Sequence, residues 1–161
     1  MQLEAALNAG TPCHHGTTDR IEGVKTVIRV TAICLYDHDG RLLTVRKQGT
    51  DKFMHPGGKP EPGESAAEAG SRELAEEVGV DVAAAALELM GIWTGTAANE
   101  SNTDIEATVF TAPGTWDPAA IHPAAEIAEL RWLDIKQAAS LDDLAPLLTE
   151  YVLPRLAASR Q

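Results

Sequence analysis

Apolar residues in this chain come in runs separated by short polar breaks, and the runs predict the strands of a sheet. Residues 24–36 (VKTVIRVTAICLY) are β-branched and almost continuously apolar, which indicates a strand buried on both faces. Residues 37–40 end in Asp-Gly, a frequent hairpin turn, so residues 41–47 (RLLTVRK) should form the return strand. Further strands are predicted over residues 87–96, 105–112 and 129–133.

Helices are predicted in two places. The first should begin directly after Ser65, because Ser65 and Glu68 have the spacing of a capping box, and it should end at Gly79 in a left-handed turn. The second covers residues 144–157, and Pro154 would kink it. Strands and helices together predict an α/β domain with helices packed on a sheet.

Composition limits the classes of protein to which the chain can belong. A length of 161 residues favours one core, so residues 23–161 are expected to form a single domain after a flexible lead-in at residues 1–22. A net charge of −11 argues against binding to nucleic-acid backbones. The chain has no apolar stretch of the roughly 18 residues that span a bilayer, and its N-terminus lacks the basic start of a signal peptide. We therefore expect a cytoplasmic protein without membrane partners.

Three carboxylates in the first predicted helix are the main candidates for chemistry. Glu73, Glu76 and Glu77, here called the helix glutamates, stand at positions i, i+3 and i+4, so they share one face of a helix. Converging carboxylates suit a hard cation such as Mg²⁺ or Mn²⁺. On spacing alone a solvated acidic surface is the simpler interpretation, so the flanking residues must decide.

The residues around the helix complete a site for a metal and a phosphate. Gly57 and Gly58 allow the backbone to approach a ligand closely. Glu64 lies at the start of the helix, and Arg72 can fix a carboxylate by a bidentate pair. Attack on phosphorus by an activated water is the chemistry that this arrangement favours.

The same segment resembles the Nudix box, G-x5-E-x7-R-E-U-x-E-E-x-G-U, where U is aliphatic. Every fixed position is filled, by Gly58, Glu64, Arg72, Glu73, Leu74, Glu76, Glu77, Gly79 and Val80. The resemblance to the Nudix (MutT-like) hydrolases implies an α/β/α sandwich with a mixed β-sheet. It also implies hydrolysis of a nucleoside diphosphate linked to another moiety X.

The resemblance implies a role for each box residue. The helix glutamates would hold Mg²⁺ or Mn²⁺ and carry catalysis. Gly58 would add its carbonyl oxygen to the metal site and Glu64 would assist. Arg72 would orient a glutamate.

Outside the box the candidates are single residues. A late glutamate acts as base or extra metal ligand in some Nudix enzymes, and Glu126 is our candidate, with Glu100 and Asp104 as rivals. Trp93 and Trp132 could stack on a base, although their strand positions favour packing.

The residues expected to bind substrate lie near the two glycines. Lys59 could contact a phosphate, with a solvated lysine as the alternative, and His55 could line the pocket, with a filler role as the alternative. Arg46 ends the run LLTVR, which resembles the start of a coenzyme A subclass motif, but Pro56 follows too soon for the rest of that motif. Gly57 and Gly58 complete this set.

The substrate is the least determined part of the prediction. Signatures of the ADP-ribose, dinucleoside polyphosphate and NADH subclasses are missing after the box. We expect a small nucleotide, either a nucleoside triphosphate, including oxidised forms, or an ADP-sugar such as ADP-ribose. The alternative is a non-catalytic module that senses a nucleotide. Homodimers are frequent in this family, so a homodimer is expected.

Overall fold

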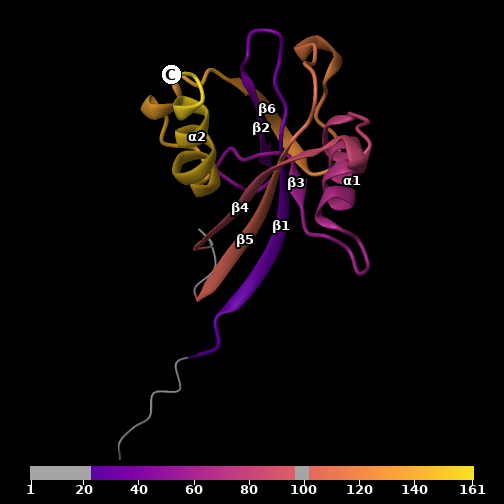
Figure 1. Cartoon of the computed structure of the whole chain (residues 1–161), viewed down its shortest axis with the longest axis vertical. Coiled ribbons are helices and arrows are strands. Elements are labelled where there is room, and N and C mark those ends of the chain that lie inside the picture. The colour runs from indigo at the N-terminus through magenta and orange to yellow at the C-terminus, as the bar shows by residue number, and fades with distance from the viewer. Residues whose placement is uncertain (1–22, 97–101) are drawn as a thin grey trace, which may run out of the picture.

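The computed structural model describes residues 23–96 and 102–161. The predicted lead-in at residues 1–22 and the candidate Glu100 lie outside the described residues. Figure 1 shows a sheet at the centre of the molecule with helices on either side of it. Within the described residues no helix is long and apolar enough to cross a bilayer.

The main sheet has four strands in the order β3-β1-β5-β4. Strands β1 (Thr26–Cys34) and β5 (Thr103–Thr111) pair in parallel over their whole length, and β4 (Glu88–Thr96) pairs with β5 antiparallel. Strand β3 (Gly57–Gly58) adds a short antiparallel pair on the other edge of β1. The sheet is therefore mixed, as predicted.

The predicted turn and return strand are present, but the hairpin pairing extends only a short way from the turn. The chain turns back at Asp37–Gly40 into β2 (Leu42–Lys47), whose hairpin pairing is limited to the residues just after β1, where the Leu43 amide donates to the Leu35 carbonyl. Strand β2 then pairs with β6 (Ile127–Leu133) in a separate two-stranded antiparallel sheet. The reason is that β3 and β5 already occupy both edges of β1.

The first predicted helix is confirmed as α1, which spans Ala66–Val78. Both hydrogen bonds of the capping box between Ser65 and Glu68 are present. Gly79 ends the helix at φ 69° and ψ 25°, a left-handed conformation that glycine adopts at little cost. An N-cap serine such as Ser65 stabilises a helix by about 1 kcal/mol.

The second predicted helix is present with altered backbone bonding. A π-helical segment at Leu147–Val152 leads into α2 at Leu153–Ala158. Pro154 lies in the first turn of α2, directly after the π-helical segment, so the helical run continues through it. Short 3₁₀ turns occupy Ala84–Ala86, Pro118–Ala120 and Ala138–Ser140.

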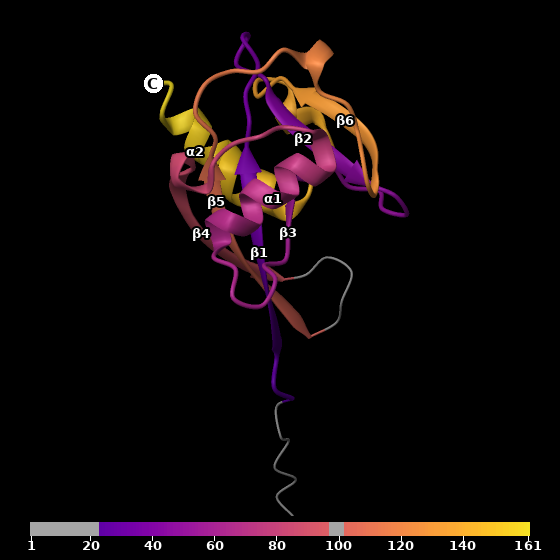
Figure 2. The same ribbon diagram turned by 90° about the vertical axis from the view of Figure 1, so that its right-hand side faces the viewer.

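Two apolar clusters hold the helices on opposite faces of the sheet. Ile33 of β1 and Leu35 just after it belong to the cluster with α1, whereas Ala32 and Cys34 of β1 belong to the cluster with the C-terminal helix. Figures 1 and 2 show α1 and α2 on opposite sides of the main sheet. The expected α/β/α sandwich is confirmed, and its two-sided burial follows from the alternation of side chains along a strand.

The prediction that the first strand is buried throughout is correct only for its second half. Residues 31–35 are buried, but Val27 is 51% exposed, and Figure 1 shows this end of β1 running below the helices. An apolar run indicates a strand, but it does not say how far the helices cover that strand.

The helix α1 lies very close to β1 at one point. Gly70 faces the sheet, and a Cβ atom added there would stand 2.5 Å from Cδ1 of Ile33. Glycine lowers helix propensity by about 1 kcal/mol relative to alanine, so this position exchanges helix stability for close packing. The helix glutamates are held against the sheet as a result.

Candidate active site

The helix glutamates lie at three different depths. The side chain of Glu77 is 0% exposed, that of Glu73 is 13% exposed and that of Glu76 is 55% exposed. Glu77 shares the buried face of α1 with Leu74 and Val78, which are themselves buried. Glu77 is therefore the innermost of the three carboxylates, Glu73 is intermediate and Glu76 is the most exposed to solvent.

Backbone groups of the two glycines lie against these carboxylates. The Gly57 amide donates a hydrogen bond of 3.1 Å to Oε2 of Glu77. Gly57 has φ 151°, and a Cβ atom there would collide with the carbonyl oxygen of Thr31. A Cβ atom on Gly58 would collide with the carboxylate of Glu73. Gly57 is needed because backbone blocks a side chain there, whereas a side chain at Gly58 would displace the carboxylate of Glu73.

Arg72 connects most of the acidic groups of the box. Its Nε and Nη2 donate to both oxygens of Glu64 at 2.8 and 3.0 Å, and Nη1 donates to Glu73 at 3.0 Å and Glu76 at 3.3 Å. Nη2 also donates to the Lys59 carbonyl at 3.2 Å. The hydrogen bond from Arg72 lowers the pKa of Glu64, and the bonds from Glu64 and Glu73 raise the pKa of Arg72.

Lys47 belongs to the site although the sequence analysis did not single it out. Its Nζ lies 3.0 Å from Oε1 of Glu126, 3.2 Å from Oε1 of Glu77 and 3.3 Å from the Gly57 carbonyl oxygen. The only sequence signal was a lysine at the end of a predicted strand. Its position depends on the pairing of β2 with β6, which was not predicted.

The buried carboxylate of Glu77 has a shifted pKa. Burial raises the pKa to about 7, against the opposing effects of the Lys47 charge and the Gly57 hydrogen bond. Burial also acts on Lys47, lowering its pKa, but the neighbouring charges of Glu77 and Glu126 outweigh it and the net pKa is raised. Glu77 and Lys47 thus form an ion pair largely screened from water.

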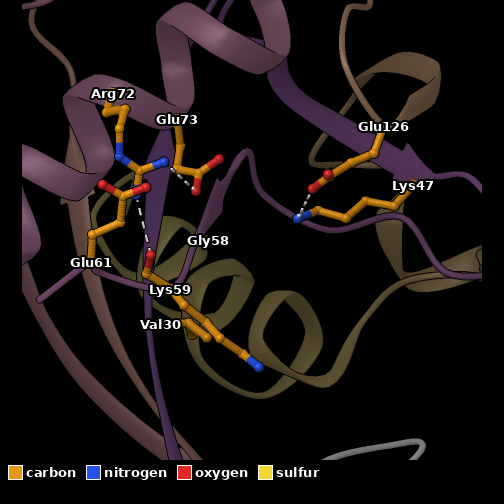
Figure 3. Close-up of a pocket in the computed structure, with 8 residues that line it drawn as sticks. All are labelled: Val30, Lys47, Gly58, Lys59, Glu61, Arg72, Glu73 and Glu126. Atoms are coloured by element: carbon orange, nitrogen blue, oxygen red, sulfur yellow. Dashed lines mark hydrogen bonds and ion pairs between the residues drawn. The ribbon is translucent and has the colours of Figure 1, made fainter.

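These groups surround a pocket of about 390 Å³. Figure 3 shows Arg72 and Glu73 on one side of it, Lys47 and Glu126 on the other, and Gly58 between them. The side chain of Lys59 runs alongside Val30. The lining residues are Val30, Lys47, Gly58, Lys59, Glu61, Arg72, Glu73 and Glu126.

The other candidate residues lie elsewhere. Arg46 pairs with Glu129 at 3.2 Å, and Asp104 pairs with Lys25 at 3.5 Å. His55 is buried, which lowers its pKa to about 4, and neither ring nitrogen has a hydrogen-bond partner among the described residues. Neither Arg46 nor His55 nor Asp104 lines the pocket.

The two tryptophans considered for base stacking, Trp93 and Trp132, are both half-buried. Trp93 packs against the cluster on the side of the C-terminal helix, and Trp132 packs against the cluster on the α1 side. The packing role that their strand positions favoured is therefore present in both cases.

The site offers oxygen donors suited to a hard divalent cation. Carboxylates of Glu73, Glu76 and Glu77 stand beside the Gly58 backbone, and Oε1 of Glu77 accepts no aligned hydrogen bond within residues 23–96 and 102–161. In that same part of the chain no three acidic, histidine or cysteine side chains already converge as a formed metal centre. Instead, Arg72 and Lys47 neutralise the carboxylates, and the donor chemistry fits Mg²⁺ or Mn²⁺.

The family of the chain follows from its match to a family model. The model of the NUDIX domain family matches residues 25–156. The chain belongs to the Nudix family. It is a Nudix pyrophosphohydrolase, of a family that acts on nucleoside diphosphate derivatives. No curated protein matches it in sequence.

Solved structures share the Nudix fold. The MutT protein of Methanosarcina mazei Go1 has a TM-score of 0.72 and 21% identity, covering 86% of this chain and 98% of that chain. The E. coli ORF135 protein has a TM-score of 0.64 and 27% identity, covering 86% of this chain and 94% of that chain. A third structure is a bifunctional NMN adenylyltransferase/ADP-ribose pyrophosphatase of Francisella tularensis, complexed with AMP and a manganese ion. It has a TM-score of 0.61 and 20% identity, covering 84% of this chain and 43% of that chain.

Proposed function

We propose that this Nudix protein uses Mg²⁺ or Mn²⁺ to hydrolyse a phosphoanhydride bond in a small nucleotide. The observation that carries the proposal is the pocket itself, where the Glu73 carboxylate of α1, Gly58 and the cations Lys47, Lys59 and Arg72 surround one space. The buried Glu77 adjoins it through its ion pair with Lys47. Acidic groups can bind a metal ion, and the cations can bind the phosphates that share it.

The metal ion would be held by the helix glutamates, together with the Gly58 carbonyl and Glu64. When bound, it supplies a polarised water and neutralises phosphate charge. Arg72 would keep Glu73 and Glu76 directed toward the pocket, since it donates to both. Its bidentate bond to Glu64 fixes the guanidinium against the first turn of the helix.

Glu126 is proposed as the base that takes the proton of the attacking water. Its Oε1 is engaged by Lys47, while its side chain is largely exposed on the pocket wall, so Oε2 can face a water. Lys59 extends into the same space, where its ammonium group can bind a substrate phosphate. Arg46 and His55 stand outside the pocket lining and receive no part in this mechanism.

The proposed substrate is a nucleoside triphosphate, including oxidised forms, or an ADP-sugar such as ADP-ribose. The bifunctional Francisella tularensis protein, part of which shares this fold, is complexed with AMP and a manganese ion, and this supports a nucleotide and a divalent cation here. A homodimer is proposed as the solution state, which sedimentation would test.

The test is a panel of nucleoside triphosphates and ADP-sugars with Mg²⁺ or Mn²⁺, with products identified by mass. At least one substrate should give a nucleotide and a phosphate product, and Glu76→Gln should abolish that turnover. Glu88→Gln, on the exposed edge strand β4, is the matched control. Stoichiometric nucleotide binding without product would favour the sensing module and reject the proposal.

A further inference from the structure

Lys47 lies at a break in the pairing of β2 with β6. Arg46 pairs with Glu129, but the next residue, Lys47, pairs with Ile127, so the register shifts between them. The extra residue at this shift belongs to β6, where Ala128 lies between the two paired residues. Bulges are frequent beside active sites. Here the side chain of Lys47 is directed into the pocket and is only 24% exposed.

The Lys47 ammonium is held by oxygens from three separate segments. Glu77 belongs to α1, Gly57 belongs to β3, and Glu126 belongs to the loop before β6. The Gly57 carbonyl accepts from Lys47 while the Gly57 amide donates to Oε2 of Glu77. One ammonium group thus ties the catalytic helix, the glycine strand and the late loop together.

The two oxygens of Glu77 have different partners. Oε2 accepts the Gly57 amide proton, whereas Oε1 accepts no aligned hydrogen bond from the part of the chain that the structure describes. Oε1 nevertheless faces the ammonium of Lys47 at ion-pair distance. It is therefore the atom of Glu77 with lone pairs free for a metal ion. A divalent cation on this oxygen would stand close to the ammonium, and positive charges repel strongly in a site with little water.

We infer that Lys47 is a positioning residue that competes with the divalent cation for Oε1 of Glu77, so that the ion pair and metal binding exclude one another. The inference rests on the proposed role of Glu77 as a metal ligand. Its consequence concerns the loop of Glu126. After its release from Glu77, the Lys47 ammonium keeps its ion pair with Glu126. Metal binding at α1 would therefore remove the link that Lys47 makes between α1 and the loop of Glu126.

Amine labelling of the full chain tests this inference directly. Reductive methylation at each lysine is measured by mass spectrometry, in EDTA and then in Mg²⁺. Lys47 should become several-fold more reactive in Mg²⁺, whereas Lys52, which donates to the Asp142 carbonyl on the surface, should not change. In Glu77→Gln the labelling of Lys47 should be high and independent of Mg²⁺.

Metal affinity gives a second readout, which a purely structural lysine would not move in this direction. Lys47→Gln should bind Mn²⁺ several-fold more tightly than the wild type at pH 8.5, where protons compete least, as measured by electron paramagnetic resonance. Circular dichroism should show that the variant is folded. Unchanged labelling of Lys47, or unchanged or weaker Mn²⁺ binding by Lys47→Gln, overturns the inference while the wild type still binds Mn²⁺. A wild type that binds no Mn²⁺ overturns the proposed function itself.

Discussion

The backbone amide of Gly57 donates a hydrogen bond of 3.1 Å to Oε2 of Glu77, so the residue just before the box fixes the innermost carboxylate of the box. This contact requires strand β3 to run against β1 without a side chain at residue 57. Both the φ of 151° and the closeness of the Thr31 carbonyl exclude a Cβ atom there.

Gly57→Ala should therefore destabilise the protein by at least about 2 kcal/mol, because backbone strain and a backbone collision add. Urea unfolding followed by circular dichroism measures the loss. Gly49→Ala is the matched control, since Gly49 has φ 78° with open space around it and isolates a strain of about 1 kcal/mol. Equal losses in the two variants would contradict the collision argument.

Arg72→Lys should lower kcat/KM by about 10- to 100-fold, the usual effect of removing a group that orients metal ligands. A lysine keeps the positive charge but cannot donate to Glu64 through two nitrogens and to Glu73 at the same time. Arg29→Lys is the control and should keep wild-type activity, because Arg29 of β1 forms only an exposed ion pair with Glu106 of β5. Full activity in Arg72→Lys would show that charge alone is sufficient.

Asp37→Asn should destabilise the protein at neutral pH, and the difference should shrink in acid. Burial alone would raise the pKa of Asp37, but hydrogen bonds from Arg41 and the Asp39 amide outweigh it and hold the pKa below 3.8. A lowered folded-state pKa gives stability that is present above about pH 4 and lost as the pH falls through that lower value. Urea midpoints of both proteins between pH 7 and pH 3 check this, and a gap independent of pH would reject it.

The thiol of Cys34 should be unreactive in the folded protein. Burial raises its pKa to about 12, although a hydrogen bond with Tyr36 acts in the opposite direction. In a Cys13→Ser background, reaction with a disulfide reagent at pH 8 should proceed only as fast as the protein unfolds and should be rapid in urea. Rapid labelling of the native protein would show that this core opens locally.

Predictions from local signals succeeded and predictions of pairing did not. The bounds of α1 followed from Ser65, Glu68 and Gly79, because caps act within a few residues. The turn at Asp37–Gly40 was also local, but it cannot specify that β2 pairs with β6. Strand β3 has two residues, too few to carry a pattern of alternation.

The same division applies to the site. The box placed its carboxylates on one helix face in advance, since helical spacing is regular. Their unequal burial, and the presence of Lys47 beside Glu77, depend on how the strands pair, which periodicity does not encode. The fixed positions of the box supply Gly58, Arg72 and Glu73 to the pocket lining, whereas Lys47 and Glu126 lie outside the box.

Gly70 limits how far the box can be moved between proteins. The motif leaves this position open, yet here a methyl group would meet Cδ1 of Ile33, a residue 37 positions earlier in the chain. The distance between α1 and the sheet therefore depends on Gly70 and Ile33 together. Grafting residues 58–80 onto another scaffold would preserve the carboxylates but not their depth, unless the partner of Gly70 were transferred with them.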